Sequence, residues 1–423
     1  MARMKRREFL NLTALAAGGA FVTSRVAFAT PTQRRQRFVV VIMRGALDGL
    51  AAVPPYADPD YASLRREVAL HAPGTAGGAL PLNGFFGLHP ALTFMQQCYA
   101  ARELTVLHAV ASPYRDRSHF DGQDVLESGS VRAHASQSGW LNRALTQLPD
   151  KRSGELGVAL GQNVPLVMRG PAGVTSWSPS KMPTLDEDTL ARITDLYSKD
   201  QLLSVRLADA LQADAIAAED AASAQPVMMT TAATTSAPAA GGVKPAGAQA
   251  YNARYAEVTH AAAGFLRQED GPKVAVFDTT GWDTHANEGG AEGQLAGRLG
   301  ALDSGLATLK QELGPAWADT AVLLVTEFGR TAAVNGTRGT DHGTGAAAFL
   351  LGGAVTGGRV IADWPGLSQR SLYQGRDLAP TLDLRCVFKG ILEEHLGVPP
   401  RALDETVFPD SGAAKPLRGL IRT

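Results

Sequence analysis

Short runs of consecutive apolar residues alternate along the chain with longer segments in which apolar residues recur every three or four positions. The runs are Phe38–Met43, Leu104–Ala111, Val274–Phe277, Val322–Val325 and Ala346–Leu351. Continuous apolar runs of this length are typical of strands buried on both faces. Their alternation with helical patterns predicts an α/β fold, a three-layer sandwich around a mostly parallel central sheet.

The helical pattern is clearest in six segments. These are residues 88–104, 117–129, 139–148, 255–268, 292–313 and 380–398. Ser118 is placed to cap the second of these helices, with Asp121 three residues later in the acidic position of a capping box. Two further segments, residues 156–161 and 165–170, are expected to form short strands outside the main sheet.

One segment interrupts this alternation. Residues 186–222 are rich in Leu, Ala and charge and are expected to be helical, but residues 223–250 are rich in Ala, Thr, Pro and Gly and carry a single charge, Lys244. Such a composition predicts a flexible insertion. Because long surface insertions cost little loop entropy, we expect one domain over residues 30–423 that contains the insertion.

The N-terminus has the pattern of a cleaved signal peptide. Arg6 and Arg7 precede a short, Gly/Ala-rich apolar stretch over residues 14–22, and an A-x-A-like site follows at Ala27–Ala29. The paired arginines and the weakly apolar stretch indicate the twin-arginine pathway, so a periplasmic or secreted protein is expected. No later apolar run is long enough to span a bilayer. Since this pathway carries folded cargo, it modestly favours a protein that is loaded with a metal before export.

Charge and cysteine content narrow the class of protein further. The 40 basic and 41 acidic residues give a net charge of −1, which leaves no electrostatic footprint for nucleic acid or an anionic membrane. The sequence lacks a P-loop and a strand-linked G-x-G-x-x-G motif, so nucleotide binding and hydride transfer are disfavoured. Cys98 and Cys386 are either a disulfide or two separate thiols.

Acidic and imidazole side chains follow several of the predicted strands. Because ligands of parallel sheets bind at the carboxyl ends of the strands, folding is expected to gather these residues. The candidate metal ligands are Asp48, Asp283, His285, Glu327, Asp341 and His342. Asp278 and His119 are further candidates, and the remaining histidines are expected to be structural.

This set of donors suits a hard or borderline divalent ion, Zn²⁺, Mn²⁺, Mg²⁺ or Ca²⁺, in one or two copies. An ion beside Ser118 would activate its hydroxyl as a nucleophile, and Arg330 or Arg117 would stabilise an anionic group. Each residue also has a simpler explanation: Asp48 as a turn cap, Ser118 as a helix cap and Glu327 with Arg330 as a structural ion pair. The D-x-H and D-H motifs at Asp283 and Asp341 are harder to explain in that way.

The motifs together resemble a known family. The stretches RGALDGL, RSHFDGQDVLESG, GWLNRAL, GWDTHANEGG, TEFGRT and GTDHG, behind a twin-arginine signal, are similar to the bacterial exported family called domain of unknown function 1501. The similarity extends over nearly the whole mature chain, Arg37 to Val398. It implies an alkaline phosphatase-like or sulfatase-like fold with a site of the two-metal esterase type.

By this resemblance Asp48 matches the first-strand aspartate, Ser118 the nucleophile, Asp283 or Asp278 with His285 the mid-chain ligands, and His342 the late histidine. The match fails at TEFGRT, where the superfamily carries adjacent Asp-His and this chain has Glu327 and Phe328. One imidazole ligand is therefore missing unless Asp341 or His119 replaces it.

Two functions follow from this comparison. The first is a metal-dependent hydrolase of phosphate, sulfate or related esters that acts on a small-molecule or polymer substrate. The alternative is a non-catalytic exported scaffold or binding protein that keeps the fold without the full metal site. The resemblance also implies a co-exported protein partner, since members of the family often pair with a second exported protein.

Overall fold

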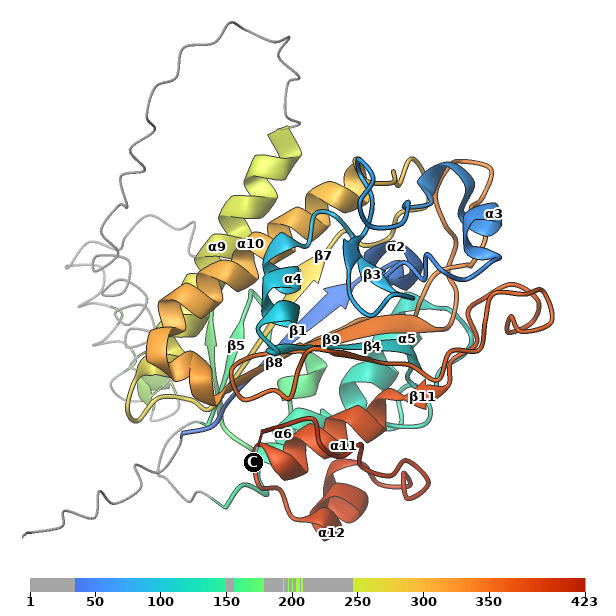
Figure 1. Ribbon diagram of the computed structural model, residues 1–423. Coiled ribbons are helices and arrows are strands. Elements are labelled where there is room, and N and C mark those ends of the chain that lie inside the picture. Colours follow the sequence, from blue (N-terminus) through green and yellow to red (C-terminus); the bar gives the residue numbers. More distant parts are fainter. Residues whose placement is uncertain are drawn as a thin grey trace, which may run out of the picture. The chain divides into compact units, whose positions relative to one another are not determined.

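The computed structural model describes residues 35–149, 156–178 and 246–422, together with isolated positions between 193 and 207 (Figure 1). The signal peptide predicted for residues 1–29 lies outside the described residues. The same holds for the insertion predicted at 223–250, except for its last five residues, and for most of the helix predicted over residues 186–222.

A mostly parallel sheet forms the centre of the fold, as the apolar runs predict. The strands, in the order in which they lie side by side, are β10 (Arg359–Ile361), β4 (Leu104–Ala111), β9 (Ala346–Leu351), β8 (Thr320–Val325), β1 (Arg37–Arg44), β7 (Val274–Thr280), β5 (Gly157–Leu160) and β6 (Val174–Trp177). A short strand, β11 (Leu382–Asp383), also pairs with β4. Only β9 runs antiparallel to its neighbours, β4 and β8, in this sheet.

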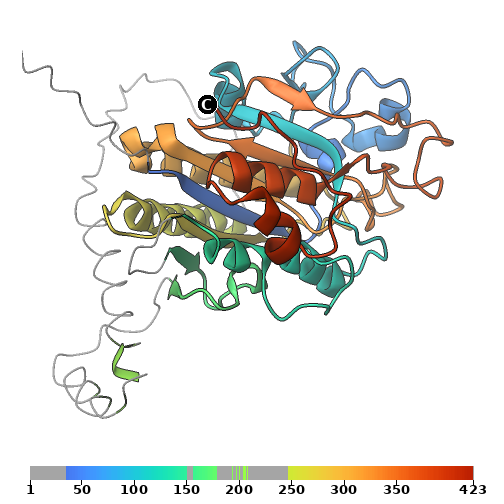
Figure 2. The ribbon, with the colours of Figure 1, turned by 90° about the horizontal axis from the view of Figure 1, so that it is seen from below.

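Helices cover both faces of the sheet (Figures 1 and 2). On one face, Val39 and Val41 of β1 belong to a core with α4 (Thr93–Ala100), α9 (Ala246–Arg267) and α10 (Gln294–Leu313). On the other face, Phe38 and Val40 belong to a second core. Its helices are α5 (His119–Ser128), α6 (Trp140–Leu145) and α11 (Leu384–Glu394). Since successive side chains of a strand point to opposite faces, β1 contributes to both cores and the three-layer sandwich is confirmed.

Three local expectations differ from the structure. Residues 165–170 contain a 3-10 helix, Leu166–Met168, instead of a strand. Residues 156–161 do contain a strand, β5, but it pairs with β7 inside the main sheet. The helix predicted from Tyr255 begins earlier, at Ala246. Among the described residues, no helix is both long and apolar enough to cross a membrane.

The two cysteines are free thiols. Cys98 is buried in α4 and Cys386 is partly buried in α11, so the disulfide that the sequence left open is not formed. Burial raises the pKa of the Cys98 thiol to about 12, which disfavours the reactive thiolate. Cys98 therefore acts as a small core residue.

Candidate metal centre

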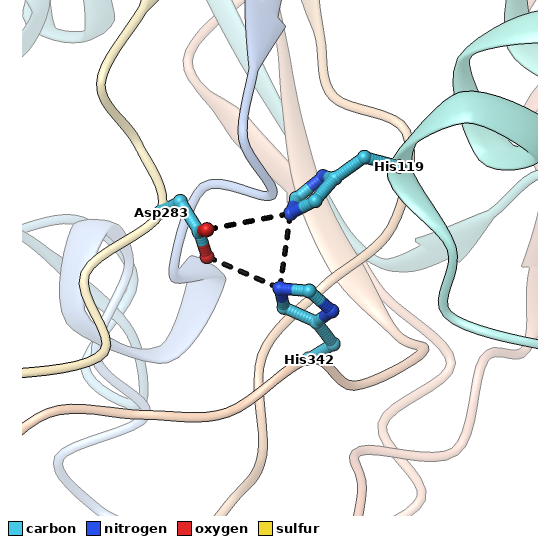
Figure 3. A group of neighbouring side chains, drawn as sticks. All are labelled: His119, Asp283 and His342. Atoms are coloured by element: carbon cyan, nitrogen blue, oxygen red, sulfur yellow. Dashed lines mark hydrogen bonds and ion pairs between the residues drawn. The ribbon is translucent and has the colours of Figure 1, made fainter.

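Two imidazoles and a carboxylate face one another beyond the carboxyl ends of the central strands (Figure 3). Nε2 of His119 lies 2.9 Å from Nε2 of His342. The Asp283 carboxylate lies between them, with Oδ1 at 3.2 Å from His342 Nε2 and Oδ2 at 3.5 Å from His119 Nε2. These three side chains, the metal cluster, are placed to share one ion.

A third imidazole adjoins the metal cluster. Nε2 of His285 lies 3.0 Å from Nε2 of His342 and 2.9 Å from Oδ1 of Asp283. His285 is therefore available as a fourth ligand on the side of Asp283 and His342.

The other ring nitrogen of each histidine has an acceptor of its own. Nδ1 of His119 contacts Oε1 of Glu327 at 2.8 Å, Nδ1 of His285 contacts Oδ1 of Asp341 at 3.1 Å, and Nδ1 of His342 contacts the Arg117 carbonyl at 3.0 Å. These ionised carboxylates and the carbonyl only accept hydrogen bonds, so each Nδ1 carries a proton and the Nε2 atom of each ring is left to face the cluster. In neutral rings these atoms are lone pairs about 3 Å apart, which repel one another and are stabilised by a cation among them.

This arrangement fits a bound metal ion. Histidine ligands of metals ordinarily donate their second N–H to a carboxylate or carbonyl, as all three histidines do here. Imidazole nitrogens combined with one carboxylate suit Zn²⁺ better than Mg²⁺ or Ca²⁺, which prefer oxygen ligands throughout.

The pKa values agree with a polarised cluster. The hydrogen bond to Glu327 raises the pKa of His119, whereas burial and the neighbouring His119 lower the pKa of His342. Burial opposes ionisation of Asp283, but the hydrogen bond from Arg330 outweighs it and the pKa of Asp283 is lowered. Asp283 is therefore a carboxylate at neutral pH, as a metal ligand must be.

The first residue of one helix and two loops form the cluster, and glycines let these segments approach closely. His119 opens α5, Asp283 follows β7, and His342 lies in the loop between β8 and β9. Gly45, after β1, has a φ of +117°, and a Cβ there would lie 2.8 Å from the Asp283 nitrogen. A Cβ on Gly343 would lie 2.3 Å from the Arg330 carbonyl oxygen. Any side chain at these two glycines would push the loops apart.

The structure brings together Asp283, His285 and His342 as expected. Glu327 and Asp341 instead contact the far ring nitrogens of His119 and His285. Glu327 is buried, and its carboxylate accepts hydrogen bonds from the Gly45 N–H, His119, Gln123 and Thr326. Asp341 accepts from His285 and Asn335. Both carboxylates orient a histidine instead of facing the cluster.

Asp48 lies in a separate buried network. Its Oδ1 accepts from the Leu50 and Ala51 N–H groups as the N-cap of α2 (Gly49–Ala52), and Arg65 donates to its Oδ2. Arg65 also contacts Glu288 at 3.3 Å. The simpler explanation of Asp48, a cap, is the one that the structure supports.

This buried network supports the cluster from behind. Thr340 Oγ1 donates to Glu288 and accepts from Arg330 Nε, and Arg330 in turn donates to Asp283. All three donor nitrogens of the buried Arg330 side chain are used in this way, on Thr340 and Asp283. Arg330 therefore fixes the position of Asp283, which differs from the expected role on the anionic group of a substrate.

The other expected groups lie near the cluster but do not belong to it. Ser118 is the N-cap residue of α5, yet its side chain makes no capping hydrogen bond. Arg117 is engaged by Asp377 and Gln374, at 2.8 and 2.7 Å. Asp278 pairs with Arg44 at 2.7 Å.

His119 supplies the imidazole that the TEFGRT motif lacks. The ring of Phe328, the residue after Glu327 in this motif, stacks on His119 with ring centroids 5.0 Å apart. Of the two substitutes that the sequence left open, His119 reaches the cluster and Asp341 does not. The sequence signal for His119 was its place a few residues after the predicted strand Leu104–Ala111, next to Ser118.

Replacing Glu327 with glutamine is expected to weaken metal binding by about 10–100-fold, because the amide cannot orient His119 as the carboxylate does. Isothermal titration of the chelator-treated protein with zinc measures this change. Glu103→Gln is the matched control, since Glu103 accepts hydrogen bonds from Lys310 and Trp317 instead of a cluster histidine. Equal zinc affinity of both variants and the unmodified protein would refute the role of Glu327.

The buried network predicts a pH dependence of stability. Burial and the negative charge of Asp48 raise the pKa of Glu288 to about 8. The folded protein therefore holds a proton that the unfolded chain releases near pH 4.5. The resulting stability is fully present below pH 4.5 and is lost as the pH rises through about 8. Relative to Glu288→Gln, the unfolding free energy of the unmodified protein should fall between pH 6 and pH 8. An equal difference in unfolding free energy between the two proteins at pH 6 and at pH 8, measured by denaturant titration, would contradict this.

Comparisons with known proteins agree with the sequence motifs. A family model described as protein of unknown function (DUF1501) matches residues 100–407. No curated protein matches the sequence.

The chain is also similar to several solved structures. One is Ps i-CgsB in complex with k-i-k-neocarrahexaose, with a TM-score of 0.38 and 9% identity over 90% of this chain and 77% of that chain. Another is the C-terminal periplasmic domain of EcEptC from Escherichia coli in complex with Zn, with 0.35 and 10% over 89% and 87%. A third is the phosphonate monoester hydrolase of Agrobacterium radiobacter, with 0.33 and 11% over 86% and 74%.

The identity of the chain follows from the family model, because the matched residues make up well over half of its length. They include His119, Asp283 and His342 together with the outer carboxylates Glu327 and Asp341. The chain belongs to the family of proteins of unknown function called DUF1501.

Proposed function

We propose that the protein is a metal-dependent hydrolase of phosphate, sulfate or related esters that holds one divalent ion, Zn²⁺, at the metal cluster. The observation that carries the proposal is the convergence of His119, Asp283 and His342, with Nδ1 of each imidazole on an acceptor. Exposure fits as well, since 39% of the Asp283 side chain is accessible while the Arg330 side chain behind it is buried.

One ion is proposed instead of two because the other expected ligands are already saturated. Asp48 accepts from two backbone N–H groups and from Arg65. Both Glu327 oxygens likewise accept from N–H or O–H donors, among them His119. Neither carboxylate has the freedom to coordinate a second ion without losing these partners.

The ion, when bound, would polarise the ester oxygen and stabilise developing negative charge. The chain's own groups would position it: His119, Asp283 and His342 as ligands, with His285 as the fourth. Ser118 is the proposed nucleophile or anion-holding group, because it directly precedes His119 and its hydroxyl is not used as a cap. Arg330 would keep Asp283 ionised and oriented.

We also propose export by the twin-arginine pathway to the periplasm or beyond. The proposal rests on Arg6, Arg7 and the A-x-A-like site at Ala27–Ala29. Replacing both arginines with lysine should leave the unprocessed chain in the cytoplasm, as cell fractionation would show.

A non-catalytic scaffold is the second candidate, and one observation favours it. Phe328 stacks on His119, and Arg330 occupies an oxygen of Asp283, so the cluster is more enclosed by protein groups than an open catalytic site requires. In that case the protein would bind a co-exported protein partner.

Elemental analysis together with a panel of chromogenic phosphate, phosphodiester and sulfate esters separates the two candidates. The hydrolase proposal predicts about one zinc per chain and zinc-dependent cleavage of at least one ester class. The scaffold would be favoured if the protein is purified without metal, cleaves none of the esters even after zinc is added, and retains a partner in pull-down.

A further inference from the structure

A pocket of about 580 Å³ shares helix α5 with the metal cluster. Helix α5 links the two: its first residue, His119, faces the cluster, while Phe120 and Gln123 line the pocket. The Gln123 side chain also donates to Glu327, the carboxylate that orients His119. The pocket is therefore connected to the cluster through two successive hydrogen bonds to Glu327, one from Gln123 and one from His119.

One cation of the pocket, Arg44, is neutralised by carboxylates of the same pocket. Arg44 donates to Glu127 at 2.8 Å, to Asp278 at 2.7 Å and to the Gln123 side-chain oxygen at 2.9 Å. The second oxygen of Glu127 accepts the Val167 N–H. Arg44 is therefore occupied by two carboxylates, whereas Arg169, which also lines the pocket, is exposed and donates its Nε–H to the Val164 carbonyl.

The rim of the pocket has a different character. Phe120 is 85% exposed, the most exposed of the large apolar side chains in the described part of the chain. Gln162 and Asn163, both exposed, line the same pocket with their amides, which donate and accept hydrogen bonds. Asp124 adds a carboxylate acceptor.

We infer that this pocket binds a hexose ring, the alcohol portion of the ester whose anionic group the metal cluster takes. The inference rests on the proposed function and names its substrate class. One exposed aromatic face surrounded by amides and carboxylates matches the two surfaces of a sugar ring, an apolar C–H face and a periphery of hydroxyl groups. The volume exceeds that of one ring, so the pocket has room for a neighbouring sugar of an oligosaccharide.

One other class of ligand fits the pocket less well. A second phosphate or sulfate would meet three carboxylates, Asp124, Asp278 and Glu127, and two arginines, Arg44 and Arg169, so the pocket carries a net negative charge against it. A nucleobase would stack on Phe120 as a sugar ring does, and adenosine therefore serves as one of the probes.

Saturation-transfer NMR on the chelator-treated full mature protein tests the inference without any catalysis. The probes are maltose, cellobiose, lactose and adenosine. Transfer to at least one disaccharide is expected, and Phe120→Ala should reduce it by about tenfold or more. Val131→Ala is the matched control, since Val131 is 46% exposed and does not line the pocket. Asn163→Ala should weaken the same signal, and because both positions are exposed, both variants should fold.

The outcomes are distinct. Absence of transfer to all three disaccharides, transfer to adenosine alone, or an equal signal in Phe120→Ala and Val131→Ala would overturn the inference. Disaccharide binding that depends on Phe120, in a protein that cleaves no ester after zinc loading, would support the pocket and contradict only the proposed hydrolase.

Discussion

Replacing His342 with alanine is expected to remove bound metal and to reduce any ester hydrolysis to background. Nε2 of His342 contacts His119, His285 and Asp283, more members of the site than any other single atom among the described residues reaches. Its loss leaves one histidine and one carboxylate of the metal cluster and removes the ring that contacts both His119 and His285. The affinity for zinc should fall by more than about 100-fold, which exceeds the loss found when a residue that only orients a ligand is removed.

Mass spectrometry of the intact folded protein and zinc titration measure this effect. His71→Ala is the control, since His71 is exposed and lies apart from the cluster. Circular dichroism should show that both variants keep the fold. Unchanged zinc content in His342→Ala would refute the assignment of the cluster, whereas loss of zinc in both variants would point to a site elsewhere.

Replacing Arg65 with methionine is expected to lower the free energy of unfolding by about 3–5 kcal/mol. Arg65 is fully buried, and it is the cation against which Asp48 and Glu288 are packed. Burial opposes ionisation of Asp48, but the charge of Arg65 overcomes it and lowers the pKa of Asp48. Without Arg65 a carboxylate remains buried and uncompensated. Urea denaturation of metal-free protein measures the loss.

Arg401→Met is the matched control for this prediction. Arg401 pairs with Glu405 one helical turn away, but 85% of its side chain is exposed, so the change should cost less than about 1 kcal/mol. Adding Asp48→Asn to Arg65→Met should recover part of the lost stability, because it removes the uncompensated charge. Equal costs for Arg65→Met and Arg401→Met would show that the buried network contributes little.

Much of the fold could be predicted because both faces of the sheet are buried. A strand buried on both sides needs consecutive apolar residues, so β1, β4 and β8 are directly visible in the sequence. The prediction of a strand over residues 165–170 was wrong because a short apolar run after Pro165 fits a 3-10 turn as well as a strand. Tertiary packing decides between the two.

The sequence predicted which segments form the candidate site, but not which of their residues face the cluster and which only orient its histidines. A sequence shows that Glu327 and Asp341 follow strands near histidines, but it does not show which way a side chain points. Glu327 turns inward because the Gly45 N–H and Thr326 offer it hydrogen bonds in the core. His119 is one residue past a helix cap, where a short motif search finds no partner, and only the fold brings it to His342.

The central claim is that His119, Asp283 and His342 coordinate one ion, and a crystal of the zinc-loaded protein tests it most directly. An anomalous difference map recorded at the zinc edge should show one strong peak per chain, about 2.0–2.2 Å from Nε2 of His119, Nε2 of His342 and a carboxylate oxygen of Asp283. A peak that touches none of these atoms, or no peak in a protein shown to be saturated with zinc, would contradict the account.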